Sequence, residues 1–339
     1  MKKISIYAIL FGLTFVGSAN ALQYSYGNSN FKLNASGSAG IIEPKFKDTL
    51  FLGDFELGAR YTYAITDSQK LGLVYEYDAD SIDENDFAHD AFALWEMRGV
   101  GRIEAGLTES AAHKLGVGIP DVGGLRIYNK PLFYKKILPR GNIIPNTSVT
   151  TGHDAPRVNV VTAATDAGQY GLSVAAFGDD YDYAIDGGVK FRFPDGKLKS
   201  ALSLGASFMD KPHGFSAATY APDIYADWRV QGSVGYNLQY NSWIWGTSAV
   251  VIYDENPIGT AGDGISAGTG ISYDLLNYSV SLSYIYSHTG LWHEYMEKYR
   301  EHTVVGSVRY KYDEYVSMWL SIGLITETPF VTAAMKLEF

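Results

Sequence analysis

Hydrophobic and polar residues alternate one by one along most of this chain. Apolar side chains stand at every second position in runs such as 31–41, 55–63, 198–208, 278–286 and 304–312. Successive side chains of a β-strand face opposite sides of the sheet, so each run would carry one apolar and one polar face. The runs are about 9–11 residues long, which is the length of a tilted strand that crosses a bilayer. The pattern therefore predicts an all-β protein built from long strands.

The links between these runs alternate between short and long. Short polar turns such as 66–69 and 194–196 are separated by longer polar stretches such as 209–223. Short turns on one rim, long loops on the other, and Tyr and Trp at the strand ends are typical of a transmembrane antiparallel β-barrel. The runs between Asn30 and Phe339 predict about 16 strands, with 14 or 18 as alternatives, and the even number brings both termini to the short-turn rim.

Residues 1–21 have the pattern of a cleaved export signal. A basic start and an apolar run precede Ala19-Asn20-Ala21, which supplies a cleavage site of the small-x-small type. The apolar run has about 14 residues, whereas a helix that spans a membrane needs about 20. We therefore expect residues 22–339 to form a single exported domain.

The composition narrows the possible functions. The chain has 27 Lys and Arg against 37 Asp and Glu, a formal net charge of −10, and the loss of Lys2 and Lys3 with the export signal would make it −12. An acidic chain without a basic stripe is not expected to bind nucleic acid. The absence of cysteine excludes thiol catalysis, zinc–thiolate sites and disulfides.

Two parts of the chain resemble a known family. Residues 331–339 alternate in hydrophobicity and end in Phe339, similar to the C-terminal signal of Gram-negative outer-membrane general-diffusion porins, which the barrel-assembly machinery captures as an added strand. The stretch 119–124 is similar to the acidic turn in the long loop of these porins, and 91–106 resembles the two strands before it. The resemblance implies a homotrimer of 16-stranded barrels in the outer membrane of a Gram-negative bacterium, in contact with lipopolysaccharide and other outer-membrane lipids.

The resemblance also implies a long loop that folds inward after the fifth strand. This constriction loop would cover residues 109–154, before a sixth strand that starts near Pro156, and Asp121 would be the acid at its narrowest point. A loop of this length is either functional or a sign of a wrong strand assignment. The alternative is an extracellular loop that lies over the barrel mouth. Two departures from the family are Leu107, where an arginine often follows the glycine, and the excess of basic over acidic residues in the loop.

Charged residues on the polar face of each run are expected to face a water-filled lumen. A charge that faces lipid at mid-height costs about 2–4 kcal/mol. This rule places Lys32, Arg60, Arg102, Arg157 and Glu76 inside. The resemblance to porins implies that the strands of the first four form the pore wall that faces the constriction loop. Because the exported chain is acidic, we expect mild cation selectivity.

Motifs for catalysis or metal binding are weak. The stretch 293–297 differs by one residue from a zinc motif, and the acidic cluster 78–86 lacks the glycine of a calcium loop. We therefore expect no catalytic residues, no metal and no cofactor. The sequence favours an outer-membrane channel for passive diffusion of small hydrophilic solutes and ions. A substrate-selective channel for sugars or oligosaccharides is the main alternative, and a barrel enzyme or adhesin is a more distant one.

Overall fold

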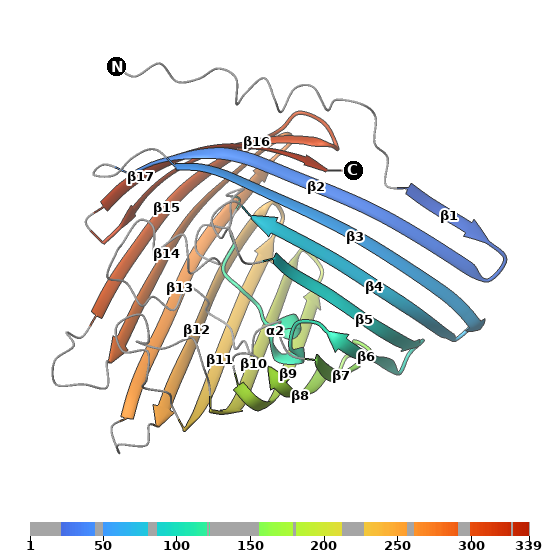
Figure 1. Cartoon of the computed structure of the whole chain (residues 1–339). Coiled ribbons are helices and arrows are strands. Elements are labelled where there is room, and N and C mark those ends of the chain that lie inside the picture. The colour runs from blue at the N-terminus through green and yellow to red at the C-terminus, as the bar shows by residue number, and fades with distance from the viewer. Residues whose placement is uncertain are drawn as a thin grey trace.

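The protein folds as a closed barrel of antiparallel β-strands (Figure 1). The computed structural model describes residues 22–44, 50–80, 87–120, 122, 156–178, 181–211, 227–255, 261–290, 299–326 and 328–338. The expected export signal, Asp121, the rest of the expected constriction loop after residue 122, the zinc-like stretch 293–297 and Phe339 lie outside the described residues.

The chain contributes seventeen strands to one sheet and a short helix that follows the sixth strand. In chain order the elements are β1 (Leu22–Tyr26), β2 (Ser29–Pro44), β3 (Leu50–Thr66), β4 (Gln69–Asp80), β5 (Phe87–Met97), β6 (Gly101–Leu107), α2 (Ala111–Leu115), β7 (Pro156–Thr162), β8 (Gln169–Gly178), β9 (Tyr181–Asp195), β10 (Leu198–Asp210), β11 (Trp228–Tyr240), β12 (Trp243–Glu255), β13 (Ala261–Leu275), β14 (Tyr278–Gly290), β15 (Tyr299–Lys311), β16 (Val316–Ile325) and β17 (Thr328–Glu338).

Both ends of the chain complete the barrel at the same strand. Each strand from β2 to β17 pairs antiparallel with the next, and the ring closes when β17 pairs with residues 36–44 of β2. The short β1 pairs with residues 29–33 on that same edge of β2, so it continues the line of β17. The strands from β2 to β17 are therefore the sixteen strands of a closed barrel, which confirms the predicted fold class and strand number.

Tight turns connect the strands on one rim. Gly196 adopts a φ of 54° in the turn between β9 and β10, and Asn241 adopts a φ of 51° in the turn between β11 and β12. Two-residue hairpin turns require positive φ angles, which glycine and asparagine adopt at low cost. The predicted short links therefore lie at one end of the barrel, and the longer connections lie at the other.

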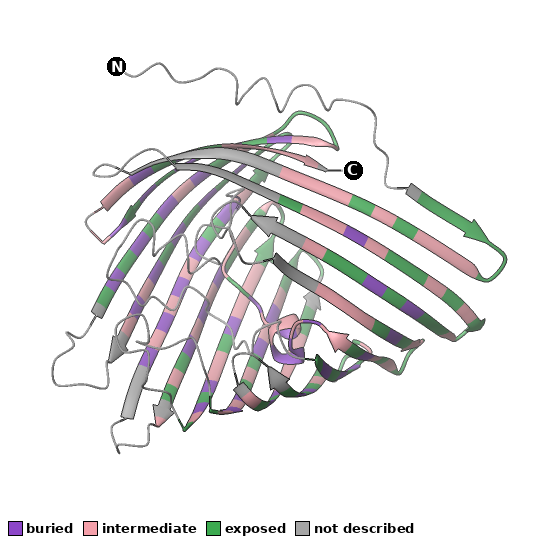
Figure 2. Ribbon diagram, in the orientation of Figure 1, coloured by how far each residue is buried: buried purple, intermediate pink, exposed green. Residues whose placement is uncertain are grey.

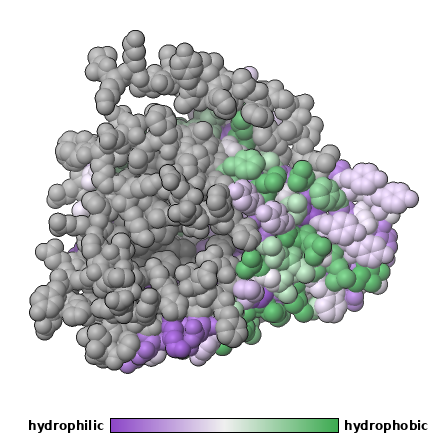
Figure 3. Space-filling view, in the orientation of Figure 1, coloured by the Kyte–Doolittle hydropathy of each residue, from purple (hydrophilic) through white to green (hydrophobic). Residues whose placement is uncertain are grey.

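The two faces of the wall differ in the way that the sequence alternation predicts. On β7, Val158 and Val160 are 50% and 47% exposed. The alternating residues Asn159 and Val161 are only 0% and 2% exposed. Figure 2 shows the same alternation along the other strands. The exposed large hydrophobic side chains gather on the outer wall, as on the described part of the face in Figure 3. The barrel is therefore apolar outside and polar inside.

Aromatic rings form contacts around the outer wall at two levels. Near the long-loop rim, Trp228 lies 6.5 Å from Phe208 and 5.4 Å from Tyr253 between ring centroids. Near the short-turn rim, Trp243 lies 4.5 Å from Tyr273. Tyrosine and tryptophan favour the two membrane interfaces because each ring has an apolar body and a polar tip.

Several strands are longer than the sequence pattern predicts. β10, β11, β12, β14 and β15 have 13 residues each, and β3 has 17. The hydrophobic alternation reports only the part of a strand within the apolar band, whereas strand pairing continues beyond that band.

No helix among the described residues is long and apolar enough to cross a membrane.

Candidate functional site: the lumen and its inner segment

The inner faces of β10 to β14 carry mostly serine and glycine. These small residues occupy alternate positions that face the lumen, and many of them are buried although their side chains are polar. They include Ser203, Ser207, Gly235, Gly246, Ser248, Ser266, Gly268, Gly270, Ser281 and Ser283. A wall of this kind leaves space for another chain segment and offers hydroxyl groups to it.

The chain after β6 turns into this space and forms α2. The contacts of α2 are with β7, β8, β9 and β10, and Figure 1 shows it within the curve of the barrel. Ser110 caps the helix, because its Oγ accepts a hydrogen bond from the backbone N–H of His113 at 3.2 Å. Ala111 and Leu115 pack with Val161 of β7 in a small hydrophobic cluster. We call residues 109–120 and 122 the inner segment.

Inward-facing side chains hold the backbone of the inner segment against the wall. The backbone N–H groups of four of its residues donate to side chains of the wall: Ala111 to Ser173 Oγ at 3.3 Å, Ala112 to Asp186 Oδ1 at 2.8 Å, Val117 to Ser203 Oγ at 2.9 Å, and Val122 to Ser281 Oγ at 3.2 Å. Ser283 Oγ donates in turn to the carbonyl of Pro120 at 3.1 Å. The segment therefore runs along the wall from β8 to β14.

Glycine at the points of closest approach makes room for this backbone. A Cβ atom at Gly270 would lie 2.9 Å from the carbonyl oxygen of Pro120, and a Cβ atom at Gly246 would lie 2.8 Å from Pro120 Cδ. A Cβ atom at Gly235 would collide with the carbonyl oxygen of Val117. Larger side chains at these positions would push the inner segment away from the wall.

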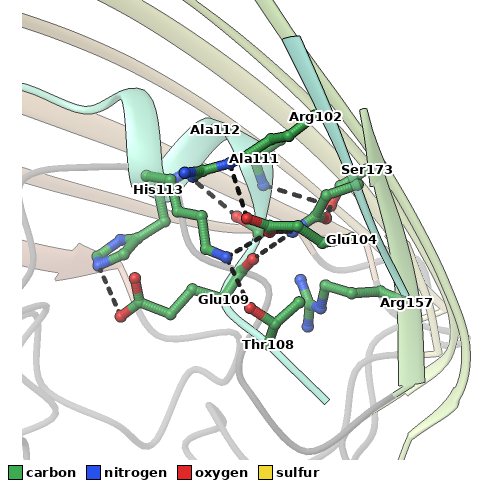
Figure 4. A network of polar contacts seen from close by, with 12 residues as sticks. Arg102, Glu104, Thr108, Glu109, Ala111, Ala112, His113, Arg157 and Ser173 are labelled. Carbon is green, nitrogen blue, oxygen red and sulfur yellow. Dashed lines mark hydrogen bonds and ion pairs between the residues drawn. The ribbon is translucent and has the colours of Figure 1, made fainter. Parts of the chain in front are cut away.

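A buried carboxylate, Glu104 on β6, anchors the start of the inner segment (Figure 4). Its residue is 2% exposed, and its two oxygens lie 2.8 Å from Arg102 Nε and 2.6 Å from Lys114 Nζ. Lys114 also donates to Thr108 Oγ1 at 2.6 Å and lies 4.9 Å above the ring of Phe92. Glu104 thus links the end of β6 to α2 through charge-assisted hydrogen bonds.

The anchor continues across β7 and β8 through a chain of amide and hydroxyl groups. Asn159 Nδ2 donates to Glu104 Oε2 at 3.0 Å and to the carbonyl of Glu109 at 2.8 Å, and Ser173 Oγ donates to Asn159 Oδ1 at 2.7 Å. Because Asn159 is fully buried, its side-chain amide needs these partners. The network fixes where the chain leaves the wall and enters the lumen.

The residues predicted to line the pore occupy different environments. Arg60 is about half exposed, and its Nη2 lies 3.6 Å from Glu96 Oε2. Lys32 pairs in register with Arg60 on the neighbouring strand, and both Lys32 and Glu76 are exposed. The side chain of Arg157, in contrast, is 0% exposed, and its Nη1 lies 4.0 Å from Asp186 Oδ2.

Sequence reasoning did not find three members of the anchor: Lys114, Asn159 and Ser173. Lys114 was only one of several basic residues in the expected loop, and Asn159 and Ser173 were ordinary polar positions on alternating strands. The clearest signal was the series of serine and glycine residues at inward-facing positions. Such small side chains leave space beside the wall for another chain segment.

Titratable groups at the long-loop rim form a separate pair. Lys211, which follows β10, donates from Nζ to Asp182 Oδ2 at 2.7 Å, and this hydrogen bond raises the pKa of Lys211. Within the described ranges, no three His, Asp or Glu side chains come together as metal ligands.

Solved structures share this barrel over nearly their whole length. The trimer form of the outer membrane protein OmpT of Vibrio cholerae matches with a TM-score of 0.68 and 12% identity, over 92% of this chain and 100% of that chain. The anion-selective porin from Comamonas acidovorans matches with a TM-score of 0.62 and 13% identity, over 92% and 100%. The fold is that of outer-membrane porins.

A Salmonella typhi OmpF structure in complex with daunomycin has the same porin fold, with a TM-score of 0.63 and 10% identity, over 94% of this chain and all of that chain. No protein-family model and no curated protein matches the sequence. The likeness to the porin fold is therefore one of architecture, with very low identity in sequence.

Proposed function

We propose that this protein is an outer-membrane channel that lets small hydrophilic solutes and ions diffuse passively through a water-filled lumen. It would act without catalysis and without a cofactor. The inner segment and the loop that follows it would narrow the lumen and set the upper size of the solutes that pass. The charged side chains of the wall would set the preference among these solutes.

The observation that supports this proposal most directly is the position of the inner segment. Its backbone is bonded to inward-facing residues of β8, β9, β10 and β14, so the long connection after β6 begins inside the barrel. A polypeptide that enters the lumen there reduces the cross-section of the lumen. It leaves the opposite part of the inner wall uncovered. Lys32, Arg60 and Glu76 belong to that other side and are exposed.

The test is the conductance of the purified protein in a planar bilayer. We expect stable single-channel steps, and we expect deletion of residues 126–140 to raise the conductance and to admit larger sugars in liposome-swelling assays. The matched control removes residues 212–226, an equally long stretch between β10 and β11. An absence of channels would contradict the proposal. Equal effects of the two deletions would contradict a constricting role for the long loop.

We further propose that the protein works as a homotrimer in the outer membrane of a Gram-negative bacterium, surrounded by lipopolysaccharide and placed there by the barrel-assembly machinery. The apolar outer wall with two levels of aromatic rings supports a membrane location. The trimer form of the Vibrio cholerae protein with the same fold supports three subunits. Conductance steps in multiples of three, and a trimeric mass in mild detergent, are the expected results.

A further inference from the structure

The charged residues of the lumen are separated along the barrel axis. Inward-facing cations gather on the parts of the strands near the short-turn rim: Lys32, Arg60, Lys70, Arg102, Lys190, Arg192, Lys199, Arg309 and Lys311. Nearer the long-loop rim, the described acidic residues Glu56, Glu76, Asp90, Asp186 and Glu301 outnumber the buried cations Arg157 and Arg229. Although the chain as a whole is acidic, the lumen has a basic end and an acidic end.

The acidic residues near the short-turn rim do not cancel this basic end. Arg60 neutralises Glu96 at 3.6 Å, and Arg102 and Lys114 share Glu104 at 2.8 and 2.6 Å. The Nη2 of Arg309 lies 4.0 Å from Oδ1 of Asp274. Each of these acids therefore already has a cation beside it, and the described inward-facing cations near this rim outnumber the acids.

Three of the remaining cations form a row on β9 and β10. Lys190 and Arg192 stand at alternate positions of β9, so both face the lumen, and Lys199 is the diagonal neighbour of Arg192 across the strand pair. This geometry places neighbouring Cβ atoms about 7 Å apart. The charged side chain that interacts with Lys190 electrostatically is Arg192, and the interaction is repulsive because both are cations. None of the three has an ion-pair partner among the described residues, and Arg192 and Lys199 are exposed.

The row begins directly below the inner segment. A Cβ atom at Gly188, the inward position before Lys190, would lie 2.8 Å from Ala112 Cα, so α2 rests on the wall at this point. The next inward positions toward the short turn are Lys190 and Arg192. A solute that passes α2 on this side therefore meets the three cations in succession.

We infer that Lys190, Arg192 and Lys199 form a binding site for anionic solutes with phosphate or carboxylate groups at the short-turn mouth of the lumen. Guanidinium and ammonium groups bind such oxyanions through charge-assisted hydrogen bonds. An oxyanion that bridges neighbouring cations reduces the electrostatic repulsion between them. The site rests on the proposed channel function and adds a solute class to it.

The test uses pyrophosphate as the probe in bilayer recordings of the full-length protein at low salt. We expect pyrophosphate to reduce the potassium chloride current at concentrations at which an uncharged disaccharide has no effect. The variant Lys190→Gln/Arg192→Gln/Lys199→Gln should require about tenfold more pyrophosphate for the same block, since local charge concentrates counter-ions by at least this factor. Its reversal potential in a salt gradient should shift toward cation preference.

The matched control removes three positive charges that lie away from this row: Arg98 in the turn between β5 and β6, Lys211 at the long-loop rim and Arg300 on the outer face of β15. This control should keep the block and the reversal potential of the parent protein. Equal shifts in the two variants, or no shift in the first, would overturn the site while the channel function stands. If the triple variant does not fold, the single variant Lys199→Gln and a loss of block in 1 M salt for the parent protein decide the question, because the Debye length falls to about 3 Å at that salt. An absence of any channel would overturn the proposed function and the site together.

Discussion

Single glycines on the inner wall determine how closely the inner segment can approach. Gly235 faces the lumen on β11, and a Cβ atom there would collide with the carbonyl oxygen of Val117. Gly232 stands on the outer face of the same strand, and a Cβ atom there would meet only Val251 Cγ2 at 3.6 Å. The two glycines lie in the same strand, but Gly235 faces the inner segment and Gly232 faces outward.

This difference predicts the effect of one methyl group. Gly235→Ala should lower the free energy of unfolding by about 1–3 kcal/mol, because overpacking forces the backbone of the inner segment to move. Gly232→Ala should leave stability almost unchanged. Urea unfolding in detergent micelles, followed by tryptophan fluorescence, compares the two variants. If both variants unfold at the same urea concentration, Val117 does not lie against β11.

At the scale of elements, α2 and its contact with β9 can be tested covalently. Ala112 Cβ would lie 3.5 Å from a Cβ atom at Gly188, which is within the range for a disulfide, and a slight shift of α2 would relieve the 2.8 Å approach of this atom to Ala112 Cα. Since the native chain has no cysteine, two introduced thiols have no competing partner. The double variant Ala112→Cys/Gly188→Cys should therefore form a disulfide on mild oxidation, detected as a loss of maleimide-reactive thiols and a faster band on gels.

The neighbouring position on the other face of β9 provides the control. A Cβ atom at Gly187 would have no part of α2 within 4 Å, and its nearest neighbours would be the carbonyl oxygen of Gly171 and Leu172 Cδ1. Ala112→Cys/Gly187→Cys should keep both thiols free. Cross-linking of the control but not of the first pair would place α2 elsewhere.

The elements also explain how far the sequence predicts this structure. Period-two alternation reveals strands because one face meets lipid and the other meets water, and it located Pro156 as the start of the strand after the long loop. It does not reveal which inward residues are covered by the inner segment. Arg157 has the pattern of a pore-lining residue but is buried, and its partner Asp186, from a strand two positions along the barrel, also binds the backbone of the inner segment at Ala112.

At the scale of the whole molecule, assembly depends on the last strand. β17 pairs with β16 on one side and with β2 on the other, so the barrel cannot close without it. Phe339→Ala should lower the yield of the folded, heat-modifiable band on unheated gels, because an aromatic end group is part of the signal that the resemblance to porins implies. Folded yield equal to that of the parent protein in cells would contradict an assembly role for Phe339.

The junction at β2 has a consequence for the order of events in the life of the chain. The first strand of the ring, β2, pairs with β17, so the ring can close only after β17 has been synthesised. Contacts between residues so distant in sequence form slowly, and until then both open edges can pair with other chains. Before β17 reaches β2, the barrel therefore exposes two strand edges that can pair with other chains. The pairing of β17 with β2 thus sets the moment at which the protein loses these exposed edges.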